Sequence, residues 1–326
     1  MLPGTMSGGH PAVQRPRGAD MGPSRWRGQP GRLEVWYATF TDPATGEGFW
    51  LHHELVAPVS GDAYVHGWAA AFPPDAPAEY WRFGPEPMPR SIRSDVWFTS
   101  AGTHVDGAAM RGSAGAMSWE LAYADEGRPL YTFPRWAWDR ESLPAAQVLP
   151  APTARLSGTV RIGDREVRLD AAPGGIARIY GHGNAKRWAW LHADLGGGDV
   201  LEVVAAVSKR PGMNRMPPLP IMRLRVDGID RPRQPLVAGM AGSATVELPR
   251  WQAISRWGRH RIRVEVELPP GSSVAVPYTD PDGETCVCTN SERASAHIAL
   301  ERWAGHWTSE REWTLDGTAH AEVGLR

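Results

Sequence analysis

The stretch IYGHGNAKRWAWLHADL, residues 179–195, passes from a glycine-rich turn into a strictly alternating pattern. A period of two is that of a β-strand, whose successive side chains point to opposite faces. One face of this predicted strand carries Trp188, Trp190, His192 and Asp194. Two indoles, an imidazole and a carboxylate are costly to bury unless other groups satisfy them. The face therefore indicates either a polar site or a strand whose Asp194 end reaches solvent while the indoles pack in the core.

Strand signals continue on both sides of this stretch. Residues 32–40, RLEVWYATF, are rich in β-branched and aromatic residues, and the turn-like DPATG at 42–46 leads to a returning strand at 48–56. Residues 261–268 alternate apolar and charged side chains, as a half-buried strand does. The best helix candidate, 251–257, is short. Many short strands with tight turns predict an all-β, antiparallel chain folded as two β-barrel or sandwich domains.

Length and prolines suggest how the chain divides. At about 100–200 residues per domain, 326 residues predict two domains. Residues 143–152 contain three prolines, which interrupt a strand ladder, and we interpret them as a linker between domains at 31–148 and 149–326. A long loop within one larger domain is the alternative. Residues 1–30 hold eleven Gly or Pro and almost no apolar periodicity, which predicts a flexible tail.

Composition excludes several classes of protein. Lys and Arg number 35 against 36 Asp and Glu, so the net charge of −1 offers no basic surface for nucleic acid or anionic lipid. No run of about 18 apolar residues predicts a transmembrane segment, and the first 30 residues lack the apolar core of a secretory signal. The two cysteines, Cys286 and Cys288, fit neither a zinc site nor a disulfide framework and are interpreted as packed thiols. We therefore expect a reduced, cytoplasmic protein.

The 16 tryptophans against six phenylalanines are unusual. Indoles suit the walls of large apolar cavities, although core packing is the better interpretation for most of them. Signatures of other enzymes fail: residues 181–186 lack the third glycine of a dinucleotide loop, and residues 53–57 lack the second histidine of a zinc protease. No metal or organic cofactor is predicted.

Four motifs resemble one family. A tyrosine, a short polar loop with asparagine and then RWAWL, at 180–191, resemble the signature of the lipocalin-like carotenoid 1,2-hydratases, tocopherol cyclases and AttH-type proteins. EVWY at 34–37, SWELAY at 118–123 and AHAEVG at 319–324 resemble further family segments in the same order. Diels–Alderases with two lipocalin-like halves share that architecture. The resemblance spans 32–326 and implies two lipocalin-like domains around a cavity for an isoprenoid, polyene or polyketide.

The resemblance also implies where the site lies. Asn184 is retained from the family loop, whereas Ala185 and Lys186 replace the usual Trp and Gly. His182 or Gly183 stands where an aspartate is common, so an imidazole that titrates near neutral pH takes the place of a carboxylate. We predict His182 as acid/base and Asn184 as orienting donor.

Other residues complete the predicted site. The catalytic set is His182, Asn184 and His192, and the substrate-binding set is Trp36, Tyr37, His52, Glu54, Tyr180, Trp188 and Trp190. On one strand His52 and Glu54 share a face and His53 points oppositely, but which face meets the cavity stays open. His66 is interpreted as a strand-end residue and Glu322 as a buried anchor.

Two functions fit these residues. A cofactor-independent cyclase, hydratase or isomerase would protonate an alkene beside electron-rich walls, and a pericyclase would need only a shaped pocket with one donor. The alternative is a carrier of a lipid or pigment, which needs no acid–base group. The His- and Asn-bearing loop beside indoles favours the enzyme, whose partner would be a hydrophobic small molecule. The oligomeric state stays open.

Overall fold

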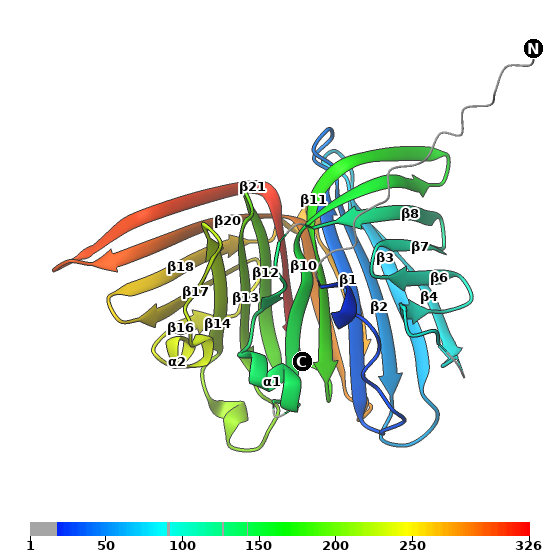
Figure 1. The fold of residues 1–326 in the computed structure, drawn as a ribbon, viewed down its shortest axis with the longest axis horizontal. Helices are drawn as coiled ribbons and strands as arrows, with labels where there is room; N and C mark the ends of the chain where they lie inside the picture. Colours follow the sequence, from blue (N-terminus) through cyan, green and yellow to red (C-terminus); the bar gives the residue numbers. More distant parts are fainter. Residues whose placement is uncertain (1–17, 90–91, 126, 142) are drawn as a thin grey trace, which may run out of the picture.

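The computed structural model describes residues 18–89, 92–125, 127–141 and 143–326 and consists almost entirely of β-strands. They form two large antiparallel sheets, each curved, that lie against one another along the middle of the molecule (Figure 1). This confirms the predicted all-β fold with two lipocalin-like halves. No helix in the described part of the chain has the length and apolar character needed to cross a bilayer.

The first sheet, sheet A, has the order β4-β3-β2-β1-β11-β10-β8-β7-β6-β5, and β9 pairs with β10. Its strands are β1 (Arg32–Thr41), β2 (Gly48–Ala57), β3 (Tyr64–Phe72), β4 (Glu79–Pro87), β5 (Val96–Thr99), β6 (Thr103–Asp106), β7 (Ala109–Ala114), β8 (Met117–Ala124), β9 (Leu130–Tyr131), β10 (Ala145–Ile162) and β11 (Arg165–Gly181). The predicted hairpin is β1 and β2, and β1 also pairs with β11, more than 120 residues later. Long-range pairing therefore builds this half.

The second sheet, sheet B, has the order β15-β14-β13-β12-β21-β20-β18-β17-β16, and β19 pairs with β20. Its strands are β12 (Arg187–Gly196), β13 (Asp199–Val207), β14 (Leu219–Val226), β15 (Ile229–Arg231), β16 (Ser243–Thr245), β17 (Arg250–Trp257), β18 (His260–Glu267), β19 (Val274–Thr279), β20 (Thr285–Trp303) and β21 (Trp307–Leu325). The short helices are α1 (Arg135–Arg140), α2 (Pro235–Met240), η1 (Ala19–Met21), η2 (Met213–Arg215) and η3 (Pro270–Ser272). The helix expected at 251–257 is wrong, because these residues pair with β18 as β17.

Alternation along the strands produces the three larger of the four apolar clusters among the described residues. On β1, Trp36 and Phe40 pack inside sheet A, whereas Val35 and Tyr37 face sheet B. Sheet B has its own apolar core, to which β12 contributes Leu191. A third cluster contains residues of both sheets and fills the space between them. The space between the sheets is thus where side chains from distant parts of the chain meet.

The chain crosses from sheet A to sheet B at 182–186, not at the proline-rich stretch 143–152. That stretch is largely the start of β10, so 149–181 continue sheet A. Pro150 and Pro152 fall where the register of β10 against β11 shifts. A proline lacks the N–H that a regular ladder uses and is tolerated at such irregular positions. The prolines therefore mark bulges within a strand rather than the linker that we expected.

Residues 18–30 are not a free tail, while residues 1–17 of the predicted tail lie outside the described residues. This N-terminal strap (18–30) packs across sheet A. Glu34 accepts hydrogen bonds from Ser24 Oγ (2.6 Å) and the Arg25 backbone N–H (2.8 Å), and Trp36 Nε1 donates to the carbonyl of Gly22 (2.6 Å). The buried carboxylate of Glu34 thus supplies hydrogen-bond acceptors to the strap, and no local sequence pattern in the strap predicted them.

Candidate active site

A layer of polar and aromatic side chains lies between the two sheets. Its members carry carboxyl, imidazole, amide, phenol or indole groups: Tyr37, His52, Glu54, His66, Trp68, Gln147, Trp188, Trp190, His192, Glu202, Tyr278, Asn290, Glu292, His320 and Glu322. All are buried or nearly so. Buried polar groups are normally hydrogen-bonded, so this inter-sheet layer needs a partner for each group.

A surface groove of about 470 Å³ lies between β3, β4 and β19, and His66 is the member of the layer that lines it. Its lining includes Tyr64, His66, Arg82, Pro277 and Thr279. The volume lies in the range of small-molecule sites. His66 Nε2 lies 2.7 Å from Oε2 of Glu54, whose side chain is almost completely buried. The groove therefore reaches an imidazole that lies within ion-pair distance of a buried carboxylate, although the contact lacks hydrogen-bond geometry.

Buried aromatic rings pack next to His66, whose ring lies 6.0 Å from that of Trp68. The His52 ring stacks on Trp68 at 4.0 Å between centroids, and Tyr278 meets both rings edge-on at 5.7 and 5.0 Å. Burial holds the pKa of His52 well below its usual range, so this imidazole is neutral. Both His52 nitrogens and Trp68 Nε1 are buried without a hydrogen-bond partner among the described residues. A neutral imidazole has one donor and one acceptor nitrogen, so these unused donors and acceptor are groups that a bound molecule would satisfy.

A row of four titratable side chains crosses adjacent strands of sheet B farther along the layer. Glu202 Oε2 lies 3.0 Å from His192 Nδ1, the rings of His192 and His320 stack at 5.9 Å, and Glu292 Oε2 lies 2.5 Å from His320 Nδ1. Burial lowers the pKa of His320 to about 3 and raises the pKa of Glu292 well above its usual range. Both directions favour a neutral pair, with the proton on the Glu292 carboxyl.

Glu202 also joins the two sheets. Its Oε1 accepts hydrogen bonds from Trp190 Nε1 (2.6 Å) and from Gln147 Nε2 (2.7 Å). Gln147 belongs to sheet A, and its Nε2 also lies 2.6 Å from the Tyr37 hydroxyl. Trp188 Nε1 donates similarly to Glu322 (2.7 Å), which supports the interpretation of Glu322 as an anchor. These bonds satisfy both indoles and Nδ1 of His192 without solvent, whereas His192 Nε2 is buried without a hydrogen-bond partner among the described residues.

The structure brings together six of the predicted site residues. Tyr37, His52, Glu54, Trp188, Trp190 and His192 all belong to the inter-sheet layer. This answers the open question about β2: His52 and Glu54 face sheet B, whereas His53 packs inside sheet A against Phe98. Trp36 also faces the interior of sheet A, because it alternates with Tyr37. Because Trp36 is buried inside sheet A, it is separated from the groove.

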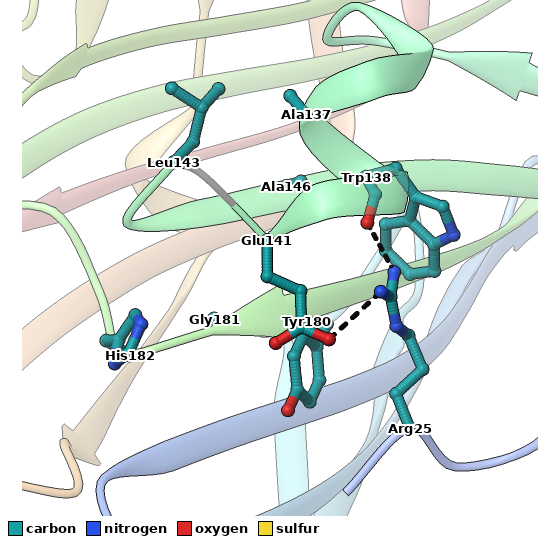
Figure 2. Close-up of a pocket in the computed structure, with 9 residues that line it drawn as sticks. All are labelled: Arg25, Ala137, Trp138, Glu141, Leu143, Ala146, Tyr180, Gly181 and His182. Atoms are coloured by element: carbon teal, nitrogen blue, oxygen red, sulfur yellow. Dashed lines mark hydrogen bonds and ion pairs between the residues drawn. The ribbon is translucent and has the colours of Figure 1, made fainter.

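Tyr180 and His182 lie in another place, beside the N-terminal strap. Figure 2 shows Arg25 reaching Glu141 and the carbonyl of Trp138, with Tyr180 next to it and His182 farther along the crossover. His182 is exposed, and its Nδ1 lies 2.8 Å from Arg32. Partial desolvation of the ring and the charge of Arg32 lower its pKa. The hollow among these residues measures about 10 Å³, room for about one water.

Asn184 holds the crossover in place. Its backbone N–H and its Nδ2 donate to Asp280 Oδ1 at 2.9 and 2.8 Å, and Lys209 and Arg326 pair with the same carboxylate. A Cβ at Gly183, whose φ is 126°, would lie 2.9 Å from that carboxyl group. The Gly183-Asn184 pair thus has a structural role here. The three predicted catalytic residues do not meet, and their catalytic roles stay predictions.

Sequence reasoning missed His66, Glu202, Glu292 and His320 as members of a site. The hairpin of β2 and β3 places His66 opposite Glu54, so the register of two predicted strands could have revealed that pair. Glu202 lies opposite His192 in the β12–β13 hairpin. The approach of Glu292 to His320 had no such signal, because the β20–β21 register shifts there.

Gly175 provides a direct test of how closely the sheets approach. A Cβ at this position would lie 2.6 Å from Cε1 of the buried His192 ring. We expect Gly175→Ala to lower the free energy of unfolding by about 1–3 kcal/mol, because packed interiors resist added atoms. Chemical denaturation measures the effect. Gly271→Ala is the control, since its Cβ would meet nothing within 4 Å, and equal midpoints for both variants would contradict this packing.

Comparisons with known proteins agree with this architecture. Residues 86–325 match the family model described as tocopherol cyclase-like. Two uncharacterized proteins of Mycobacterium tuberculosis, from strains CDC 1551 / Oshkosh and ATCC 25618 / H37Rv, are each 49% identical over 302 residues. The alignments cover 93% of this chain and 89% of each relative.

Solved structures share the fold at low sequence identity. CghA superposes with a TM-score of 0.60 at 15% identity, covering 96% of this chain and 93% of its own. Kievitone hydratase from Nectria haematococca gives 0.57 at 9% identity, covering 96% and 94%. An AttH-type protein of Nitrosomonas europaea gives 0.56 at 11% identity, covering 90% and 92%. At these identities the similarity concerns the arrangement of strands.

Proposed function

The chain belongs to the tocopherol cyclase-like family, and from this premise we propose that it is a cofactor-independent cyclase or hydratase whose hydrophobic substrate reacts in the groove between the two sheets. The observation that carries the proposal is the His66–Glu54 pair, 2.7 Å apart, at the inner side of that groove. A histidine beside a buried carboxylate is a common arrangement for a general acid and base in enzymes.

The chemistry follows from the groups around the groove. His66, protonated, would donate its proton to an alkene carbon of the substrate, and the cation formed would lie beside the aromatic rings of Trp68 and Tyr278. Water would add in a hydratase, or an internal hydroxyl or second alkene in a cyclase. The proton released in that step would return to the imidazole. Glu54 would keep the ring oriented and stabilise its charged form.

The name of one fold neighbour, kievitone hydratase, supports this class. CghA, another fold neighbour, is also known in complex with Sch210972. We propose an isoprenoid, polyene or polyketide as the substrate, the class that the sequence motifs implied. A purely pericyclic reaction would not need an acid–base pair, and neither would a carrier of lipid or pigment. The His66–Glu54 pair therefore favours protonation chemistry over both.

The proposal is tested in two steps. Mass spectrometry of the protein purified from its own host, with organic extraction, identifies a bound substrate or product. Turnover of that compound or its linear precursor is then compared for wild type, His66→Ala, Glu54→Gln and His182→Ala. We expect His66→Ala to lower kcat at least about a hundredfold, as loss of a general acid does.

The other variants separate the two candidate acids. Glu54→Gln should retain the fold and reduce kcat less than His66→Ala, with a shifted pH profile. His182→Ala tests the residue that the sequence favoured. Full turnover by His66→Ala together with strong loss in His182→Ala would transfer the acid role to the crossover, and an extracted compound that no variant or wild type converts would favour the carrier.

A further inference from the structure

Three loops meet at the end of the molecule where the groove opens. They are 58–63, between β2 and β3, 208–218, which contains η2, and 280–284, between β19 and β20. The backbone N–H of Val59 donates to the carbonyl of Pro281 (2.8 Å), and Lys209 Nζ pairs with Asp280 at 2.8 Å. We call this surface the loop face. In Figure 1 it lies at the lower end, near the C-terminus.

The loop face presents large apolar side chains to solvent. Val59 is 63% exposed, Met213 48% and Met216 56%. A single exposed apolar residue is ordinary in a folded protein. Two methionines three positions apart on one exposed loop form a more specific feature. Methionine is unbranched and flexible, so it adapts well to an irregular apolar partner.

Cations surround these methionines. Arg210 and Arg215 flank Met213 within the loop, and Lys186, whose Nζ donates to the carbonyl of Asn214 (3.1 Å), holds the loop from the crossover. All three are exposed, and none has an ion-pair partner in the described part of the chain.

Most acidic groups of the same face are already paired. Asp280 and Glu284 each contact both Lys209 and Arg326, and Asp282 contacts Lys209. Asp62, at the edge of the groove, is the exposed exception. The near-zero charge of the whole chain predicted no attraction to anionic lipid, but net charge does not fix where the charges lie.

We propose that the loop face docks on an anionic membrane surface, with Met213 and Met216 among the lipid headgroups and Arg210, Arg215 and Lys186 against the phosphates. Exposed apolar side chains ringed by cations have the chemistry that binds such a surface. Because the groove opens beside this face, an apolar molecule dissolved in the bilayer reaches it without crossing water. The docking proposal rests on these residues alone and does not depend on the proposed reaction.

The test is co-flotation of the full chain with vesicles of phosphatidylcholine alone and of phosphatidylcholine mixed with phosphatidylglycerol, at low and high salt. We expect binding to the anionic vesicles and its loss at high salt. Met213→Asp/Met216→Asp and Arg210→Glu/Arg215→Glu should each bind at least about tenfold more weakly, because each cation near the surface contributes severalfold to the affinity. Circular dichroism checks that both variants are folded.

A matched control lies at the tip of the β20–β21 hairpin, far from the loop face (Figure 1). Arg302 and Trp303 are exposed there, so Arg302→Glu/Trp303→Asp makes the same kinds of change. This variant should float like the wild type, and so should His66→Ala, which separates docking from catalysis. Wild-type protein that ignores anionic vesicles overturns the proposal, and so does an equal loss of binding in the hairpin variant.

Discussion

Replacing Arg178 with leucine should lower the free energy of unfolding by about 3–5 kcal/mol, one of the largest losses available to a single substitution here. Arg178 and Glu34 form an ion pair inside sheet A, and both side chains are completely or almost completely buried. Removing the guanidinium leaves the Glu34 carboxylate buried without its counter-charge. Chemical denaturation followed by tryptophan fluorescence measures the change.

The same substitution should loosen the N-terminal strap. Arg178 donates to the carbonyl of Met21, and its guanidinium lies over the rings of Trp36 and Trp138 at 5.4 and 5.3 Å. Loss of these contacts should make residues 18–30 more sensitive to limited proteolysis. Strap cleavage at the wild-type rate, with an unchanged denaturation midpoint, would contradict the importance of this pair.

Two control variants test whether the loss of stability in Arg178→Leu comes from the buried charge that is left without a partner. Arg250→Leu removes a guanidinium from an exposed pair with Glu267 and should leave the midpoint unchanged, because solvent screens such pairs. Glu34→Leu/Arg178→Leu removes both buried charges and should recover part of the loss, since no uncompensated charge remains. Recovery should be incomplete, because Glu34 also accepts hydrogen bonds from the strap.

Replacing His53 with leucine should make the protein more resistant to acid than the wild type. Burial among Phe83, Phe98 and Trp119 lowers the pKa of His53 to about 3. In the unfolded chain this imidazole takes up a proton near pH 6.5, whereas in the folded protein it stays neutral until about pH 3. The unfolded state therefore binds more protons in this window, and stability falls as the pH falls.

The expected size follows from proton linkage. Each pH unit within that window costs up to about 1.4 kcal/mol for one histidine, so from about pH 7 to about pH 4 the wild type should lose about 3 kcal/mol relative to His53→Leu. Denaturation of both proteins across this range measures the difference. The two proteins are compared with each other because the remaining titratable groups are common to both. One of them, Glu292, has a raised pKa and changes the stability in the opposite direction as the pH falls.

The control for this prediction is His306→Leu, at the turn between β20 and β21, where the imidazole is exposed. Its difference from the wild type should stay constant with pH. A constant difference for His53→Leu as well would show that His53 takes up its proton at the same pH in the folded and unfolded states, against its burial in an apolar core.

Much of the local structure follows from sequence patterns. The alternation at 188–192 predicted which side chains share a face, and Trp188, Trp190 and His192 do lie together between the sheets. The hairpin at 32–56 was predicted from its turn and flanking strands. The motif order predicted the family and the two-half all-β fold. The first two successes share one cause, since side-chain alternation and turn chemistry depend on residues close together in the chain, whereas the family came from the resemblance of its motifs.

Patterns failed where distant strands decide the outcome. The prolines at 150 and 152 were interpreted as a linker because proline disrupts a regular ladder, but bulges against β11 accommodate them. The helix expected at 251–257 is a strand because β18 pairs with it along its whole length. The strap residues were interpreted as part of a flexible tail, because the sequence does not show that Glu34 is buried and available to them.

By itself, the sequence determined that this is an antiparallel β protein of the tocopherol cyclase-like family and which residues alternate on each strand. Only the tertiary structure decided that His66 meets Glu54 in a groove, that Glu292 reaches His320 across an irregular register, and that Asn184 binds Asp280. The physical reason is that periodicity fixes the face of a side chain locally, whereas burial between two sheets fixes which faces meet. The candidate site lies where those faces meet.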